Sequence, residues 1–149
     1  IEYLNFIADI YGVPKDIRQE RIEKYLDIFE LENAIGNIIG SYSHGMKQKL
    51  VLISALIHEP ELFILDEPMV GLDPKSSFNL KEIMRQRCKE GKTVFFSTHV
   101  LEVAEKLCDR IAIINKGKII ALGTMDELRS AAEDKESLEK IFLELTDDE

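Results

Sequence analysis

The sequence has 149 residues, of which 45% are hydrophobic and 32% charged, and its formal net charge is −9. This length and composition suit one globular domain with a hydrophobic core. No apolar run approaches the roughly 20 residues that a membrane-spanning helix needs, and no basic stripe is present, which argues against a nucleic-acid partner.

Helices are predicted for the first part of the chain. Apolar residues recur at helical spacing over about 2–11 and 15–30, and Val13-Pro14 separates these segments. A third, strongly apolar helix is predicted over about 45–59. Ser43 is a good N-cap for it, and the unpaired amides of a first helical turn form a site for an anion.

Two lysines stand where the dipole of this third helix disfavours cations. Lys47 and Lys49 both lie in its first turns. Such a placement fits a solvated face, and it also fits a helix start that a phosphate visits. The local sequence leaves both interpretations open.

The apolar run Leu62-Phe63-Ile64-Leu65 predicts a strand buried on both faces, as in a parallel sheet between helices. Asp66 and Glu67 follow it directly, and Pro68 ends the strand. The two acids are therefore predicted at the carboxyl end of the strand, where open α/β sheets hold ligands. As a site they suit Mg²⁺ and the activation of a water; taken alone, they also fit the start of a surface loop.

The next helix is predicted over about 74–90. Gly71-Leu72-Asp73-Pro74 precedes it, and the local roles of Asp73 as N-cap and Pro74 as first helical residue explain this tetrapeptide structurally. Cys88 and Cys108 lie in predicted helices without metal-ligand spacing, which indicates reduced structural thiols.

A second β-rich run, Thr93-Val94-Phe95-Phe96, leaves through Ser97-Thr98-His99. The helix between the two runs implies that they are parallel, so their polar exits should meet at one edge of the sheet. His99 could donate there to a phosphate oxygen or to an attacking water. The structural alternative is a capping or boundary histidine.

The rest of the sequence predicts a short helix to about residue 108, a β-hairpin and a helical tail. Segments 110–114 and 118–122 are the hairpin strands, joined at Asn115-Lys116-Gly117. Thr124 and Glu127 have the spacing of a capping box. Segment 131–149 is strongly acidic, yet its apolar residues predict a docked amphipathic helix with a frayed acidic end. These apolar residues are Leu138, Ile141, Phe142 and Leu145.

Four segments, in order along the chain, resemble the motifs of the ATP-binding cassette (ABC) ATPases. They are Tyr42-Ser43-His44-Gly45-Met46, Leu62 to Glu67, Gly71-Leu72-Asp73 and Ser97-Thr98-His99. They resemble the family's signature motif, Walker B motif, D-loop and switch histidine. The signature departs from the commoner Leu-Ser-Gly-Gly-Gln form at three of its positions, and in this it resembles bacterial exporter-type subunits, including those for antimicrobial peptides and small drugs.

The resemblance implies a role for each of these residues. Asp66 would bind Mg²⁺ through water, Glu67 would polarise the attacking water, and His99 would contact the γ-phosphate of ATP. Residues of the signature and the D-loop would face ATP held by the opposite ATPase subunit, and the D-loop residue Asp73 would lie at the dimer seam. These residues are Ser43, His44, Gly45, Met46 and Asp73.

One motif of the family is not found in the chain. The phosphate loop (Walker A motif) should follow a strand and open a helix; its nearest match here begins at Gly40 and has Met46 where a lysine is required. The chain also begins, at Ile1, within a predicted helix. We therefore expect it to be the C-terminal part of a longer ATPase and to be inactive on its own.

The expected fold class is α/β, with a P-loop NTPase-like parallel sheet core that is partial because the phosphate-loop strand is missing, an α-helical subdomain, and a C-terminal hairpin plus helices. The expected domains are a helical subdomain ending in the signature helix (1–59), a partial ATPase core (60–123) and a C-terminal helical tail (124–149).

The resemblance implies the ATP-binding and hydrolysing subunit of an ABC transporter, which couples Mg-ATP hydrolysis to membrane transport. ATP and Mg²⁺ would be its cofactors. A second ATPase subunit and a transmembrane permease subunit would be its partners, at the cytoplasmic face of the cell membrane. Two alternatives stay open: a soluble ABC-type ATPase of translation or DNA repair, and an interaction module that docks a membrane subunit.

The missing strand leaves a gap in the expected sheet. In the family it lies between the strands that correspond to 93–97 and 110–114, so both would expose unpaired backbone groups along an apolar edge. We expect the gap to be closed by direct pairing of these two strands or by a strand from another copy.

Overall fold

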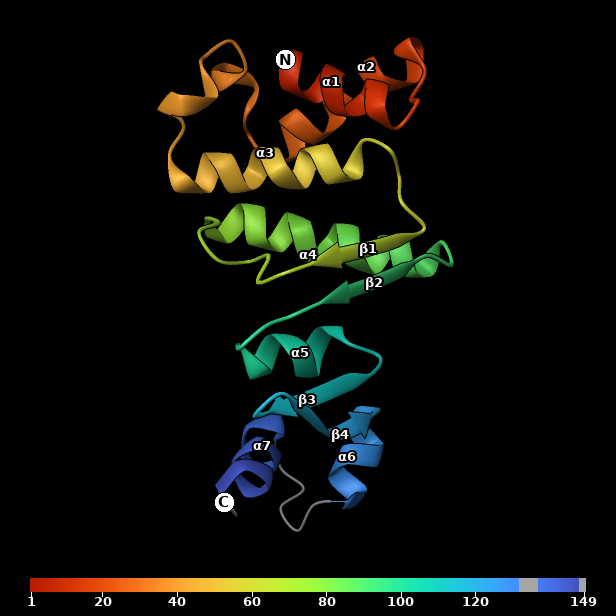
Figure 1. Cartoon of the computed structure of the whole chain (residues 1–149), viewed down its shortest axis with the longest axis vertical. Helices are drawn as coiled ribbons and strands as arrows, with labels where there is room; N and C mark the ends of the chain where they lie inside the picture. Colours follow the sequence, from red (N-terminus) through yellow and green to blue (C-terminus); the bar gives the residue numbers. More distant parts are fainter. Residues whose placement is uncertain (132–136, 148–149) are drawn as a thin grey trace. The chain divides into compact units, whose positions relative to one another are not determined.

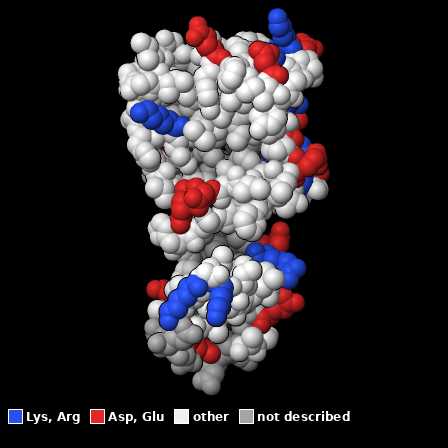
Figure 2. Space-filling view, viewed as in Figure 1, with Lys and Arg blue, Asp and Glu red and all other residues white. Residues whose placement is uncertain are grey.

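A computed structural model describes residues 1–131 and 137–147. The chain divides into two compact units, Ile1–Ser97 and Thr98–Glu149, which we describe separately (Figure 1). In the described residues, none of the helices is long and apolar enough to cross a membrane. On the face shown in Figure 2, acidic and basic side chains are scattered over a largely uncharged surface.

Three helices and two short 3-10 turns open the first unit. The helices are α1 (Glu2–Ile10), α2 (Lys15–Ile28) and α3 (His44–Leu56), and the turns are Glu32–Ala34 and Ile39–Ser41. Apolar side chains of these helices form a core, as the helical spacing predicted. Its fully buried members include Leu4, Ala8, Ile22, Ile53 and Leu56.

A buried arginine joins α2 to the end of α1. Arg18 donates hydrogen bonds to the carbonyl oxygen of Val13 and to the carboxylate of Asp9. Because α1 ends at Ile10 and α2 begins at Lys15, the predicted break at Val13-Pro14 is confirmed. The Arg18 side chain satisfies the backbone carbonyl of Val13 at this break.

The first unit also contains a two-stranded parallel sheet. Strands β1 (Leu62–Leu65) and β2 (Thr93–Phe96) are connected through α4 (Pro74–Lys89). Their register pairs Leu62 with Thr93 at one end and Leu65 with Phe96 at the other. The predicted parallel arrangement of the two apolar runs is therefore confirmed.

The expectation that β1 is buried on both faces is wrong for this chain. Phe63 is only 2% exposed, and the guanidinium of Arg87, from α4, lies over its ring. Side chains alternate between the faces of a strand, so the neighbours of Phe63 lie on the opposite face. There Leu62, Ile64 and Phe95 are 51%, 65% and 63% exposed, respectively.

The second unit consists of a hairpin and three helices. Its elements are α5 (Leu101–Leu107), β3 (Ile111–Asn115), β4 (Lys118–Gly123), α6 (Met125–Ala131) and α7 (Leu138–Asp147). β3 and β4 are antiparallel, as predicted.

Local signals explain the turns of this unit. Lys116 and Gly117 join the hairpin strands with φ angles of 47° and 76°, the conformation that two-residue hairpin loops favour. The amide of Thr124 donates to Glu127 Oε2 at 2.7 Å, and the amide of Glu127 donates to Thr124 Oγ1 at 3.2 Å. The predicted capping box is confirmed.

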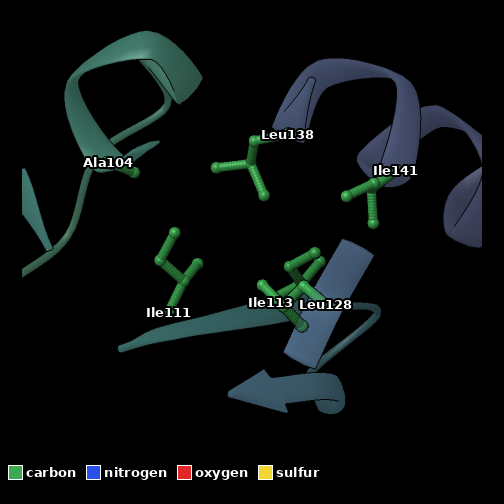
Figure 3. Packing of buried hydrophobic residues seen from close by; sticks show 6 residues of the cluster. All are labelled: Ala104, Ile111, Ile113, Leu128, Leu138 and Ile141. Carbon is green, nitrogen blue, oxygen red and sulfur yellow. The ribbon is translucent and has the colours of Figure 1, made fainter. Parts of the chain in front are cut away.

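A small apolar cluster holds the second unit together (Figure 3). Its buried members come from α5, β3, α6 and α7: Ala104, Ile111, Ile113, Leu128, Leu138 and Ile141. The predicted docking of the tail helix is confirmed for Leu138, Ile141 and Phe142, whereas Leu145 is 38% exposed. The predicted fraying concerns the end of the tail, where residues 148–149 lie outside the described residues.

The strands form two separate sheets, β1-β2 and β3-β4. The predicted direct pairing of segment 93–97 with segment 110–114 is therefore absent from the part of the chain that the structure describes. Pairing of either edge with a strand from another copy stays a prediction.

Candidate functional site

Polar residues meet at the carboxyl ends of β1 and β2. The backbone amide of Ser97 donates to the carbonyl oxygen of Leu65 at 3.0 Å, which extends the parallel ladder by one residue. The Ser97 hydroxyl donates to the Asp66 carboxylate and accepts from the amide of Glu67, with 3.0 Å between that amide nitrogen and Ser97 Oγ. The predicted convergence of the two strand exits is confirmed.

Glu67 has a left-handed backbone conformation. Its φ is 44°, which costs a residue with a side chain about 1–2 kcal/mol. The amide of Val70 donates to the carbonyl oxygen of Glu67 at 3.1 Å, so the chain turns sharply after the strand. Pro68, which has no amide hydrogen, is buried directly after Glu67. The turn therefore begins at the acidic residue itself.

The start of α3 lies at the exposed residues Ser43 and His44. The Ser43 hydroxyl accepts a hydrogen bond from the amide of Met46 at 3.3 Å, so the predicted N-cap is confirmed. Tyr42 is buried just before it and donates through its hydroxyl to the carbonyl oxygen of Ala34 at 2.8 Å. Tyr42 thus anchors the segment from which the helix begins.

Two glycines bring the start of α3 against the loop before α4. A Cβ placed on Gly45 would lie 2.6 Å from the carbonyl oxygen of Gly71, and a Cβ placed on Gly71 would lie 2.6 Å from His44 Cδ2. Gly71 also has a φ of 79°, which glycine adopts without steric cost. Gly45 therefore requires glycine because of close approach to a backbone atom, and Gly71 requires it because of its positive φ.

Asp73 binds two residues of its own chain. Its Oδ1 accepts from the Ser76 amide at 2.9 Å, as the predicted N-cap of α4, and its Oδ2 accepts from the Ser76 hydroxyl at 2.7 Å. The ammonium of Lys49 lies 2.7 Å from the same Oδ2. The Lys49 ammonium and the hydrogen bonds from Ser76 hold the pKa of Asp73 well below its ordinary value. Lys49 is thereby paired with a carboxylate despite its place near the helix start.

A long contact joins α3 to the turn that follows β1. Gln48 Nε2 lies 3.5 Å from the carbonyl oxygen of Pro68, at the outer limit for a hydrogen bond. The structure thus brings together the start of α3, the 66–68 turn and the 71–73 loop. Of the residues predicted for the site, those in the first unit all belong to these three segments.

His99 lies in the second unit, just before α5, and its side chain is exposed. Next to it, the Thr98 hydroxyl accepts a hydrogen bond from the amide of Val100 at 3.1 Å. His99 is described with the second unit, separately from the site segments of the first.

The side chains at the carboxyl ends of β1 and β2 suit Mg²⁺ that is bound through water. Within the described ranges, no group of three or more His, Cys, Asp or Glu side chains could hold a metal. Mg²⁺ usually keeps several waters and binds one or two carboxylates together with substrate phosphates. Asp66 offers one exposed carboxylate whose direction the Ser97 hydroxyl fixes. This set fits Mg²⁺ held through water.

Two residues of this neighbourhood were not singled out from the sequence for the contacts they make. The sequence identifies Ser97 only as a strand-exit residue, although parallel pairing of 62–65 with 93–96 places it level with Asp66. The pairing of Lys49 with Asp73 has no local sequence signal. The two residues are far apart in sequence, and the sequence pattern of neither helix predicts how the helices pack together.

Comparison with known proteins gives consistent matches. A family described as "AAA domain, putative AbiEii toxin, Type IV TA system" matches residues 2–105. The ABC-type transporter ATP-binding protein EcsA of Bacillus subtilis is 38% identical over 147 residues, which cover 98% of this chain and 60% of EcsA. The Nod factor export ATP-binding protein I of Burkholderia orbicola is 36% identical over 122 residues, which cover 82% of this chain and 40% of that protein.

A solved structure described as the ATP-binding subunit of an ABC transporter has a TM-score of 0.92 and 36% identity, over 97% of this chain and 61% of that one. The mixed α/β fold, with its parallel and antiparallel two-stranded sheets, matches that structure. The chain spans about half the length of the curated relatives it matches.

Proposed function

The chain belongs to the AAA-domain family and is a homologue of ABC transporter ATP-binding proteins, and from this premise we propose that it is part of a subunit that hydrolyses Mg-ATP to drive transport across a membrane. The observation that carries the proposal is the hydrogen-bonded arrangement of Asp66, Glu67 and Ser97 at the ends of two parallel strands. The similarity to a Nod factor export protein, together with the form of the signature, supports an exporter.

The proposed chemistry divides between two acids and a histidine. Asp66 holds Mg²⁺ through water, Glu67 accepts a proton from the attacking water, and His99 donates to the γ-phosphate. Bound Mg²⁺ would neutralise charge on the phosphate oxygens. The position of Glu67 directly after β1, at the start of a sharp turn, supports its role, since open α/β sheets hold ligands at the carboxyl ends of their strands.

The start of α3 is proposed to serve a second nucleotide. Ser43, His44, Gly45 and Met46 would face ATP held by the partner ATPase subunit, with Asp73 at the seam. The exposed helix start supports this role, since its amides and dipole favour an anion. The partner is either an identical or a related ATPase subunit, and a transmembrane permease completes the assembly at the cytoplasmic face of the membrane.

We further propose that β1 and β2 are part of a P-loop NTPase-like parallel sheet to which a phosphate-loop strand adds. The parallel pairing of β1 and β2 supports this arrangement, and their exposed apolar face supports a further layer packed on it, since parallel sheets are usually covered on both faces. The helical subdomain (1–59), partial core (60–123) and tail (124–149) are the proposed parts of the chain.

Replacement of Glu67 in the intact subunit tests the proposed reaction. Glu67→Gln should leave ATP binding unchanged and lower single-turnover hydrolysis by about 10²-fold or more, because an amide cannot accept the proton. Glu61→Gln, the same change at the exposed residue that precedes β1, should leave the rate unchanged. Hydrolysis by Glu67→Gln at the wild-type rate would refute the role of Glu67.

Two further measurements test the wider proposal. The 149-residue chain alone should neither bind Mg-ATP tightly nor hydrolyse it, because no residue set in it replaces the phosphate loop. In the complete assembly, hydrolysis should rise with cargo in membranes that contain the permease. ATP hydrolysis that does not depend on the permease or its cargo would favour a non-transport ATPase instead.

A further inference from the structure

One hydroxyl group joins the two acidic residues at the end of β1. Ser97 Oγ donates its hydrogen to Asp66 Oδ1 and accepts a hydrogen from the amide of Glu67, 3.0 Å away. A serine hydroxyl has one donor and two acceptor positions, so both bonds form at the same time. Consecutive residues are thereby tied to one atom, one through its side chain and the other through its backbone.

The strand pairing determines where this hydroxyl lies. Leu65 pairs with Phe96, and the amide of Ser97 donates to the carbonyl oxygen of Leu65 at 3.0 Å. The backbone of Ser97 is therefore fixed by the parallel ladder, and only its side-chain rotamer remains to be set. The two hydrogen bonds set it.

The bond to the Glu67 amide acts at the point where the chain is strained. Glu67 has a φ of 44°, and such conformations persist where surrounding groups hold them. Ser97 supplies a partner for the amide of this residue, and Pro68 is buried immediately after it. The direction in which the Glu67 side chain leaves the backbone thus depends on the Ser97 hydroxyl.

We propose that Ser97 is a positioning residue for ATP hydrolysis, which orients the Asp66 carboxylate through one hydrogen bond and the Glu67 backbone through the other. This inference rests on the proposed function. In this role Ser97 acts through its two neighbours rather than by direct contact with the water or the phosphate. Its loss should therefore lower kcat while KM for ATP, which reports binding, changes little.

Three substitutions in the intact subunit separate the hydroxyl from the space it occupies. Ser97→Ala removes both hydrogen bonds, Ser97→Cys keeps nearly the same size with a weak donor and acceptor, and Ser97→Thr keeps the hydroxyl. We expect kcat to fall by about 10- to 100-fold in the first two, with KM within about twofold, and Ser97→Thr to restore most of the rate. A loss in Ser97→Thr as large as that in Ser97→Ala would overturn the proposal.

Ser130→Ala is the matched control. The Ser130 hydroxyl is exposed and donates to the carbonyl oxygen of Asp126 at 2.7 Å, within α6 and outside the three site segments. Removing this hydrogen bond should leave kcat and KM unchanged. A similar fall of kcat in Ser130→Ala would show that loss of any hydroxyl is enough, and would overturn the assignment to Ser97.

A measurement without nucleotide tests the geometry directly. The amide hydrogen of Glu67 should exchange with solvent more slowly in the wild type and in Ser97→Thr than in Ser97→Ala or Ser97→Cys, because only the first two retain a strong acceptor. Circular dichroism confirms that each variant is folded. Equal exchange rates at Glu67 in folded wild type and folded Ser97→Ala would overturn the proposal.

The double variant separates failure of this inference from failure of the proposed function. In a Glu67→Gln background, Ser97→Ala should reduce single-turnover hydrolysis by a smaller factor than in the wild type, because the part of the effect that acts through Glu67 is already lost and only the part that acts through Asp66 remains. A further loss as large as in the wild-type background would overturn the positioning of Glu67 by Ser97. Wild-type hydrolysis by Glu67→Gln alone would instead refute the proposed role of Glu67, and the exchange measurement would then decide the geometry of Ser97.

Discussion

Gly45 and Gly71 lie so close together that a side chain on Gly45 would meet the backbone of the other residue. A Cβ at Gly45 would fall 2.6 Å from a carbonyl oxygen, well inside ordinary van der Waals separation. The contact belongs to the folded chain whether or not a nucleotide is present. The glycine of the signature therefore has a structural reason in addition to its proposed role beside ATP.

Gly45→Ala should destabilise the intact subunit. Alanine is better than glycine within a helix by up to about 1 kcal/mol, but overpacking against a backbone atom costs about 1–3 kcal/mol. We expect a net loss, measured as a lower midpoint of urea unfolding. Gly36→Ala is the control, since a Cβ at Gly36 would meet nothing within 4 Å. Equal midpoints for both variants would mean that the loop shifts without cost.

An ion pair joins Lys49, in the second turn of α3, to Asp73, the N-cap of α4. Lys49 is largely buried, with 12% of its side chain exposed, whereas 41% of the Asp73 side chain is exposed. Such partly solvated pairs contribute modestly, about 0.2–1 kcal/mol. The pair also places a cation beside the N-terminus of α4, so its benefit comes from Asp73 rather than from the helix dipole.

The stabilisation from Asp73 should depend on pH. Because its pKa is lowered in the folded state from the ordinary value of 3.8, its contribution is present above about pH 4 and is lost as the pH falls toward the folded-state pKa. Asp73→Asn retains an N-cap but loses the charge. We expect this variant of the intact subunit to melt at a lower temperature at neutral pH and the difference to shrink toward pH 3.

A second substitution identifies the partner of Asp73. In a Lys49→Met background, which retains the apolar stem of the side chain, Asp73→Asn should have a smaller effect at neutral pH. An unchanged effect would assign the stabilisation to the Ser76 hydrogen bonds rather than to the lysine.

Elements with local signals were predictable from the sequence, and contacts between elements were not. Ser43 and Asp73 cap their helices as their positions predicted, and parallel pairing followed from the helix between two apolar runs. The exposed face of β1 was missed because burial depends on what covers a strand, which its own sequence does not state. The Lys49–Asp73 pair and the Gly45–Gly71 approach were missed because they depend on how separate elements pack.

At the scale of the whole molecule, both sheets carry exposed apolar side chains. Ile64 and Phe95 are 65% and 63% exposed on the first, and Ile114 and Leu122 are 63% and 58% exposed on the second. Apolar surface of this kind is typical of interfaces. The chain spans about half of its relatives, and the exposed apolar faces support the proposal that further parts of the subunit or its partners cover each sheet.

Assembly with a second subunit can be tested at Ser43. In the intact subunit carrying Glu67→Gln, which should hold ATP without hydrolysing it, Ser43→Arg should abolish the ATP-dependent dimer seen by size-exclusion chromatography. A long side chain would occupy the space proposed for the partner's γ-phosphate. Each subunit should still bind ATP, because its own phosphate site is unaltered.

Two controls separate steric exclusion from damage to α3. Ser43→Ala removes the N-cap, at a cost of about 0.5–2 kcal/mol, without filling the space, so it should lower stability and retain most of the dimer. Ser41→Arg adds the same side chain at an exposed position two residues earlier and should leave the dimer intact. If Ser43→Arg dimerises with ATP as the parent does, Ser43 does not face the nucleotide. If Ser43→Ala loses the dimer as completely as Ser43→Arg, the start of α3 matters through its fold, and the steric argument fails.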